Sequence, residues 1–171
     1  MGRSAIVLLV PEVEDVVRHW RERDDPSAAR GMPAHITLLY PFFDAAQVDD
    51  GVVEELTHYF AGVDGFDFVL SRVGRFPTTV YLLPEPSDVF SGLTRSLTHR
   101  WPSFRPYGGQ FPDSVPHLSV SRTEDAGRRE EVADAIARSL PIRATAADAT
   151  LWVEDDDKWW HPRATLPFGP P

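Results

Sequence analysis

The sequence predicts a fold of mixed helices and strands, built as two similar lobes that meet at a shared cleft. Short β-prone runs alternate with amphipathic helical segments over the 171 residues. A strand-helix-strand pattern recurs, from IVLLVPE to PAHITL in the first half and from VYLLPEP to VPHLSV in the second. Because the length suits one domain, we expect residues 1–171 to form a single unit of two lobes.

The first half begins with an apolar run and continues with alternating helical and strand patterns. Apolar residues recur at helical spacing in the segments assigned to helices, and Asp49 or Asp50 is placed to cap the second of them. The predicted elements are a strand over residues 4–10, a helix from about residue 13 that stops at 24–26, a strand over 35–40, and a helix capped at residue 49 or 50 with its apolar stripe over 52–60.

The second half repeats this order and adds closing strands. Residues 75–77 lie between two β-prone runs, which indicates a hairpin. A segment rich in proline and glycine, residues 102–116, is expected to be a loop. The predicted elements are strands over 66–73 and 79–83, a helix after residues 84–86 with its apolar face over 90–101, a strand over 117–121, a helix over 130–140, and strands over 142–153 and 159–166.

The histidines fall into two groups. His19, His58 and His99 lie opposite the apolar stripes of their predicted helices, so we expect them to face solvent. His35 and His117 lie in predicted strands, where alternate residues share a face.

In each of these two strands the histidine shares its face with small hydroxyl residues. His35 is predicted to lie beside Thr37, with Ile36, Leu38 and Tyr40 on the core side. In the same way His117 is predicted to share a face with Ser119 and Ser121, opposite two apolar residues. The repeated architecture would bring both imidazoles to the cleft between the lobes.

Two histidines at one cleft suit acid–base chemistry at phosphorus. Histidine exchanges protons near neutral pH, so one ring can take a proton from a nucleophile while the other gives one to a leaving oxygen. The hydroxyls of Thr37 and Ser119 are placed to donate hydrogen bonds to non-bridging phosphate oxygens. This chemistry requires neither a metal nor a cofactor, and we expect none.

These two motifs, HITL at residues 35–38 and HLSV at 117–120, resemble those of the 2H phosphoesterase superfamily, in particular its bacterial 2′-5′ RNA ligase and cyclic phosphodiesterase branch. The resemblance implies a bilobal α+β fold with two antiparallel sheets flanking a cleft. It also implies an enzyme that hydrolyses 2′,3′-cyclic phosphates or reversibly joins RNA ends through 2′-5′ linkages. Its catalytic histidines correspond to His35 and His117, and its phosphate-binding hydroxyls to Thr37 and Ser119. Ser119 departs from the commoner threonine but keeps the donor.

Several further residues are candidates for substrate contacts. Arg30 precedes the first motif and could reach a phosphate. Phe42 and Tyr107 could stack on a base, although packing is the more common role of aromatic residues. Trp159, beside Trp160, could form a base-stacking wall or cover the core. His161 is a further candidate at the start of the last strand.

The composition of the chain restricts which partners the protein can bind. The net charge is −9, which argues against coating of duplex nucleic acid, while a small anionic group in a local pocket remains compatible. No apolar run is long enough to span a bilayer, and no cysteine is present. We therefore expect a cytoplasmic monomer that binds a nucleotide or an RNA end carrying a cyclic phosphate.

Two alternatives to this enzyme remain open. One is a noncatalytic module that binds nucleotides or RNA ends in the same pocket, although binding alone would not require an acid–base pair. The other is a metal hydrolase that uses both histidines and carboxylates, but the sequence lacks a recognised ligand spacing. The acidic run at residues 154–157 is better explained as a solvated hairpin tip.

Overall fold

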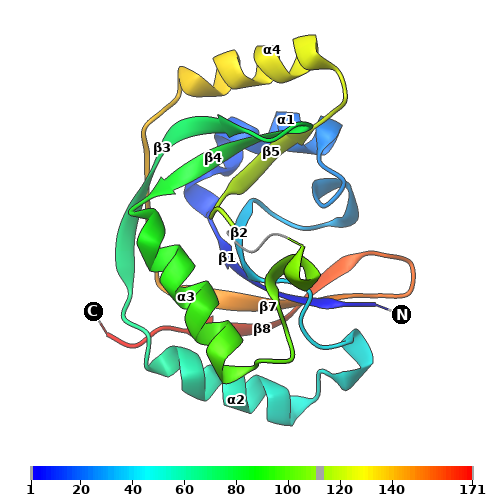
Figure 1. Cartoon of the computed structure of the whole chain (residues 1–171), viewed down its shortest axis with the longest axis vertical. Coiled ribbons are helices and arrows are strands. Elements are labelled where there is room, and N and C mark those ends of the chain that lie inside the picture. The colour runs from blue at the N-terminus through cyan, green and yellow to red at the C-terminus, as the bar shows by residue number, and fades with distance from the viewer. Residues whose placement is uncertain (1, 111–113, 171) are drawn as a thin grey trace.

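The computed structural model describes residues 2–110 and 114–170 (Figure 1). Two four-stranded antiparallel sheets, in the orders β2-β1-β7-β8 and β5-β4-β3-β6, form the two lobes. The strands are β1 (Ser4–Leu9), β2 (His35–Leu39), β3 (Phe66–Arg75), β4 (Thr79–Glu85), β5 (Leu118–Arg122), β6 (Ile142–Ala146), β7 (Asp148–Glu154) and β8 (Trp160–Pro167). The α-helices are α1 (Glu14–Asp24), α2 (Asp50–Ala61), α3 (Ser87–Arg100) and α4 (Ala126–Ala137), and the short 3-10 helices are η1 (Pro11–Val13), η2 (Ala28–Arg30), η3 (Ala45–Gln47) and η4 (Pro106–Gly109).

This architecture confirms the expected α+β fold of two lobes with antiparallel sheets, and it corrects two elements. Residues 142–153 are not one strand: β6 pairs with β3, whereas β7 pairs with β1 in the other sheet. The chain changes sheets at Ala147, which periodicity cannot reveal because both strands are β-prone. Helix α4 begins earlier than expected, since the Asp125 side chain accepts a hydrogen bond from the Arg128 backbone N–H and caps it.

The two lobes exchange helices. Helix α1 connects β1 to β2 in the first lobe but packs against β5 of the second, and α3 connects β4 to β5 but packs against β2 of the first (Figure 1). Each exchange includes a hydrogen bond. The Ser121 hydroxyl of β5 donates to Asp24 of α1 over 3.1 Å, and the Thr94 hydroxyl of α3 donates to the Leu38 carbonyl of β2 over 2.8 Å.

A shared core joins the two sheets. Buried side chains from both sheets and from all four α-helices form one apolar cluster, in which Ile36 of β2 and Leu118 of β5 are both fully buried. A smaller cluster lies on the other face of the first sheet and contains Ala5, Val7, Met32 and Trp152. Within the described residues, no helix is both long and apolar enough to cross a membrane.

Candidate functional site

The edge strands β2 and β5 line one cleft of about 400 Å³. All four residues of the two motifs contribute to its lining: His35, Thr37, His117 and Ser119. The positive charge that His117 can carry acts on the pKa of His35, so the two rings are close enough to interact electrostatically. The core-facing partners in the same strands, Ile36 and Leu118, are fully buried. The predicted division of each strand into a core face and a polar face therefore holds through these residues.

Both histidine rings are oriented in the same way. Nδ1 of His35 lies 2.7 Å from the Pro33 carbonyl oxygen, and Nδ1 of His117 lies 2.7 Å from the Val115 carbonyl oxygen. Because a carbonyl oxygen only accepts, Nδ1 must donate in both cases. In the neutral ring this leaves the proton on Nδ1 and the lone pair on Nε2. Each Nε2 can thus take a proton, or give one once the ring is protonated.

A β-bulge in β2 changes which side of the sheet the residues after Thr37 face. Ile6 and Val7 of β1 pair with Leu39 and Thr37, so Leu38 is the extra residue of the bulge. Leu38 and Leu39 are consequently both buried, and the next residue, Tyr40, returns to the cleft. The expectation that Tyr40 faces the core was therefore wrong, because strict alternation ends at Leu38.

The same device occurs in β5. Val80 and Tyr81 of β4 pair with Ser121 and Ser119, so Val120 is the extra residue. Ser121 is fully buried and does not share the cleft with Ser119, contrary to the prediction. Arg122, which follows, lines the cleft at the position equivalent to Tyr40. Sequence reasoning missed Arg122, although it is the fifth residue after His117, as Tyr40 is the fifth after His35.

His35 lies in front of a buried ion pair. Arg21 and Asp25 are 3% and 7% exposed, and Nε of Arg21 lies 3.0 Å from an Asp25 oxygen. Burial, together with the positive charge of Arg21, lowers the pKa of His35 to about 4, while the Pro33 carbonyl and Asp25 act in the opposite direction. The free protein thus holds His35 neutral at pH 7. A sequence signal for Arg21 existed, since it follows Val17 by four residues on the buried side of α1.

His117 lies among aromatic rings. The rings of Phe76 and Tyr81 meet it edge-on with centroids at 5.2 and 5.5 Å, and the Tyr107 ring lies nearly parallel to it at 6.5 Å. Burial lowers the pKa of His117, and the positive charge of Arg122 has the same effect, against the Val115 carbonyl. Neither histidine therefore carries its full charge in the free protein at neutral pH.

Tyr107 connects the two motifs. Burial raises the pKa of its hydroxyl, while a hydrogen bond with Thr37 acts in the opposite direction. Its backbone N–H donates to the Tyr40 carbonyl over 2.6 Å, and its ring lies beside His117. Its φ of 52° is in the left-handed region, which is unfavourable for a residue with a Cβ and occurs often at functional sites. The sequence suggested stacking for Tyr107, but spacing could not indicate this bridging position.

The cleft carries local positive charge despite the acidic chain. Arg30, Arg122 and Lys158 line it together with two carboxylates, Asp25 and Glu154. The charge of Asp25 is balanced by Arg21, and an oxygen of Glu154 lies 3.6 Å from Nζ of Lys158. The Arg30 guanidinium also donates to the Asp157 carbonyl over 2.7 Å, which attaches the loop before β2 to the β7–β8 hairpin.

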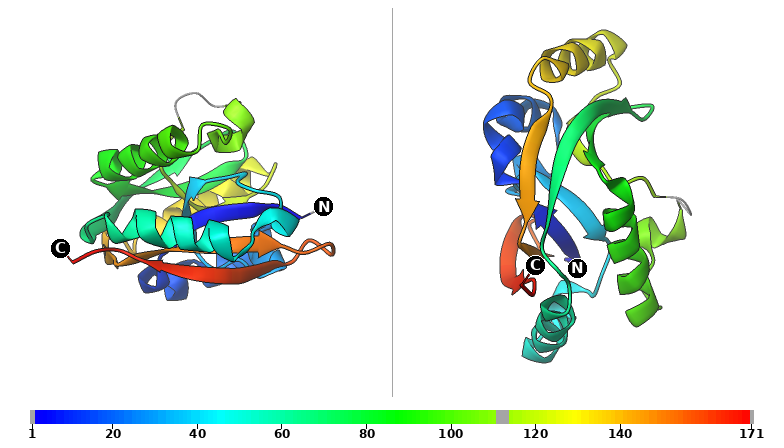
Figure 2. Two further views of the ribbon diagram at one scale, coloured as in Figure 1. Left: turned by 90° about the horizontal axis from the view of Figure 1, so that it is seen from below. Right: turned by 90° about the vertical axis from the view of Figure 1, so that its left-hand side faces the viewer.

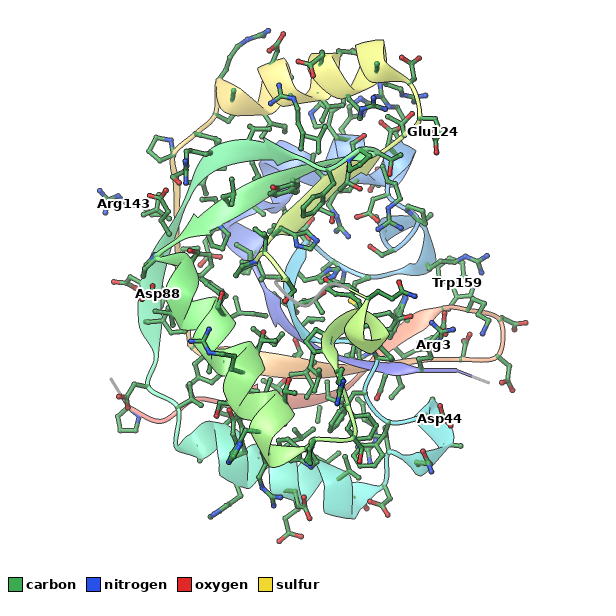
Figure 3. The ribbon with its side chains drawn as sticks, viewed as in Figure 1. Arg3, Asp44, Asp88, Glu124, Arg143 and Trp159 are labelled. Carbon is green, nitrogen blue, oxygen red and sulfur yellow. The ribbon has the colours of Figure 1, made fainter. Side chains whose placement is uncertain are left out.

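Three predicted contact residues lie elsewhere. Phe42 is 3% exposed and packs against Phe43, Trp101 and Phe104, so it has no free face for a base. Trp159 is 49% exposed at the outer edge of the hairpin (Figure 3), and its neighbour Trp160 lines the cleft instead. His161 does not line the cleft and its Nε2 lies 2.7 Å from Asp155.

The remaining predictions about titratable side chains concern the surface. His19, His58 and His99 are exposed, as their helical positions predicted. Within residues 2–110 and 114–170, no three histidine, aspartate or glutamate side chains are grouped so that they could hold a metal ion.

The chain resembles known proteins both in sequence and in structure. The model of the 2′-5′ RNA ligase superfamily matches residues 9–158. The crystal structure of E. coli LigT complexed with 3′-AMP is 16% identical over 98% of both chains, with a TM-score of 0.63. LigT complexed with ATP is 17% identical over the same shares, with a TM-score of 0.58. TT0787 of Thermus thermophilus is 15% identical over 97% of both chains, with a TM-score of 0.63. A search of curated protein sequences gives no significant match.

Proposed function

Because this chain belongs to the 2′-5′ RNA ligase superfamily, we propose that it is a metal-independent phosphoesterase that hydrolyses 2′,3′-cyclic phosphates or 2′-5′ RNA linkages. The observation that carries the proposal is the pair of equivalent imidazoles at one cleft, each with Nδ1 donating to a backbone carbonyl. Two Nε2 atoms of this kind supply the base and the acid of an in-line displacement. The shared core supports residues 1–171 acting as one unit.

In the proposed hydrolysis, one Nε2 takes a proton from water as its oxygen attacks phosphorus. The bond from phosphorus to one ribose oxygen breaks, and the other histidine, in its protonated form, gives its Nε2 proton to that oxygen. The roles of the two rings exchange in the reverse, ligating direction. Since burial keeps both rings largely neutral in the free protein, the acid form must be favoured by the negative charge of the bound phosphate.

Hydroxyl and guanidinium donors would stabilise the negative charge that develops on the non-bridging oxygens. Thr37 and Ser119 occupy equivalent positions two residues after each histidine, and both line the cleft. Arg122 adds a permanent positive charge near His117. An arginine can contact two phosphate oxygens at once, which suits this position.

Part of the lining of the cleft suits a nucleoside. Met32, Tyr40 and Trp160 supply apolar and aromatic surface, and the Tyr40 and Trp160 rings meet edge-on at 6.1 Å. A base can stack on such surface without sequence selectivity. The LigT structures are complexes with 3′-AMP, ATP and NADP+, which supports a nucleotide as the substrate class for this chain.

A substrate panel tests the proposal. The protein is incubated with 2′,3′-cyclic nucleotides, 2′-5′ dinucleotides and ADP-ribose 1″,2″-cyclic phosphate in the presence of a metal chelator, with the double variant H35A/H117A as control. We expect turnover of at least one substrate by the wild type and none by the variant. Activity that is lost with the chelator and restored by zinc would contradict metal independence. Tight binding of these compounds without turnover would instead support a noncatalytic binding module.

A further inference from the structure

A second hollow lies beside the cleft, between α3 and the segment that contains η4. Its volume is about 680 Å³, within the range of small-molecule sites. Figure 2 shows α3 and η4 side by side in both views. We call this hollow the α3 groove. Its polar walls are formed mainly by six side chains: Ser87, Ser91, Thr94, Arg95, Thr98 and Arg105.

Five of these six side chains come from one face of α3. Most of them are spaced three or four residues apart, which places them on one side of the helix. The five are Ser87, Ser91, Thr94, Arg95 and Thr98. Another side of the same helix carries Phe90, Leu93 and Leu97, which are buried in the core. The packing of α3 therefore uses its apolar side and leaves a hydroxyl-rich side with Arg95 toward the groove.

The described lining of the groove is cationic in an acidic protein. Arg95 and Arg105 line it, and its described lining residues include no aspartate or glutamate. Within the described part of the chain, neither arginine takes part in a salt bridge. By contrast, Arg100 at the end of α3 pairs with Glu55. Guanidinium groups without a carboxylate partner in a polar hollow favour a phosphodiester, because they match its geometry and charge.

A gap of about 10 Å³, room for about one water molecule, lies between the groove and the proposed catalytic cleft. On the cleft side it is lined by Thr37, Tyr40 and Tyr107. On the groove side it is lined by Thr94 and Pro106, which also line the groove itself. The Thr94 hydroxyl donates to the Leu38 carbonyl, so this wall is attached directly to the strand that carries His35 and Thr37. A chain of nucleotides could pass over Tyr107 and lie in both hollows at once.

We infer that the α3 groove binds the phosphodiester of the nucleotide next to the one held in the cleft, so that the substrate is an RNA end of two or more nucleotides. This inference rests on the proposed function for the position of the reacting phosphate. It adds a binding site with its own contacts, Arg95 and Arg105, and a dependence of affinity on chain length. Mononucleotides would occupy the cleft alone.

Equilibrium binding tests the inference separately from catalysis. The probes are a 5′-fluorescein-labelled RNA hexanucleotide ending in a 2′-phosphate, which hydrolysis of a cyclic phosphate would leave, and adenosine 2′-monophosphate as its competitor. The variant R95A/R105A is compared with the wild type by fluorescence anisotropy. The control R138A/R143A removes the same charge from exposed positions outside the groove; Figure 3 shows Arg143 at the edge opposite Trp159.

We expect R95A/R105A to weaken binding of the hexanucleotide about tenfold or more, because two phosphate contacts are lost. The slope of log affinity against log salt should become shallower by about 0.7, since one phosphodiester of a single strand is no longer neutralised. Affinity for adenosine 2′-monophosphate should stay within about twofold, as should both affinities in R138A/R143A. A hexanucleotide that binds no more tightly than the mononucleotide, or equally to R95A/R105A and wild type, overturns the inference.

The two proposals can fail independently. If the wild type hydrolyses 2′,3′-cyclic AMP but shows no dependence on chain length, the groove is not a subsite and the proposed function stands. If the wild type cleaves none of the substrates but binds the hexanucleotide through Arg95 and Arg105, the groove stands and the proposed hydrolysis fails. Equal loss of both ligands in R95A/R105A would show that the arginines act through the cleft or the fold, which also overturns the inference.

Discussion

The two strands that carry the motifs, β2 and β5, share a backbone device but differ in their surroundings. Each has a histidine whose Nδ1 donates to the carbonyl two residues earlier, a bulge three residues after the histidine, and a hydrogen bond to the helix of the opposite lobe. In contrast, His35 has a buried ion pair behind it, whereas His117 lies among three aromatic rings and Arg122.

This comparison separates the backbone features that the two strands share from the side chains around them, which differ. The orientation of the imidazole and of the following hydroxyl depends on the backbone of its strand. The hydrogen bond from Nδ1 and the bulge are the same in β2 and β5. The electrostatic environment depends on side chains from other elements, and these differ between the halves. We therefore expect matched changes in the two strands to have similar effects where they remove the shared device, and different effects where they touch the surroundings.

The largest effect should come from removing either imidazole. His35→Ala and His117→Ala should each lower kcat for a 2′,3′-cyclic nucleotide by about 10²–10⁴-fold, because each removes one proton-transfer group. The exposed His19 on α1 provides the control, and His19→Ala should leave kcat unchanged. Circular dichroism checks that the variants fold. Wild-type activity in either single variant would contradict the equivalence of the two rings.

Removal of a hydroxyl should come next. Thr37→Ala and Ser119→Ala should each lower kcat by about 10²–10³-fold through loss of a donor to the phosphate. Thr37→Ala should cost more, since Thr37 also hydrogen-bonds Tyr107. Ser119→Thr keeps the hydroxyl and should remain close to wild type. Steady-state kinetics on one cyclic nucleotide measures all three, and an inactive Ser119→Thr would argue against the donor role.

A smaller effect should distinguish the two residues that follow the bulges. Arg122→Ala should lower kcat/KM about 10–100-fold, because a hydrogen bond to a charged group contributes about 1.5–3 kcal/mol. Tyr40→Phe should change kcat/KM by less than about threefold, since the Tyr40 hydroxyl accepts from Arg3 over 2.9 Å. Equal losses in the two variants would mean that the equivalent positions act alike and that the asymmetry is only structural.

A separate effect is on stability and should be larger for His35 than for His117. The pKa of His35 is about 4 in the folded protein against about 6.5 when unfolded. The unfolded chain thus binds more protons between these values, so His35 stabilises the fold above pH 6.5 and this contribution is lost as pH falls toward 4. It amounts to roughly 3–4 kcal/mol, since the pKa differs by about 2.5 units at about 1.4 kcal/mol per unit.

Urea unfolding at pH 7 and pH 4 measures this contribution. His35→Gln replaces the ring with an amide that is not protonated in this pH range, so its stability should fall less than that of the wild type on acidification. His117→Gln should show the same change with a smaller amplitude, because the pKa of His117 is lowered without the buried arginine that acts on His35. An unchanged difference between the two pH values in His35→Gln would contradict the assignment.

The local features of this protein follow from neighbouring residues along the chain. Residue periodicity identified the strands and helices, the exposed face of His19 and the common face of His35 and Thr37, because these depend only on neighbours along the chain. The repeated motif pointed correctly to one cleft with two equivalent lobes. The internal resemblance of HITLLY and HLSVSR also contained Tyr40 and Arg122 at matching positions, but their facing could not be deduced from alternation alone.

The partner that each element contacts depends on long-range packing instead. Leu38 and Val120 are left unpaired because the residues on either side of each pair with consecutive residues of β1 or β4. This register directs Tyr40 and Arg122 into the cleft. The exchange of α1 and α3 between lobes, the division at Ala147 and the burial of Phe42 likewise depend on segments far apart in sequence. The physical reason is that local periodicity fixes the face of a residue only while its strand stays regular, and regularity is set by the neighbouring strand.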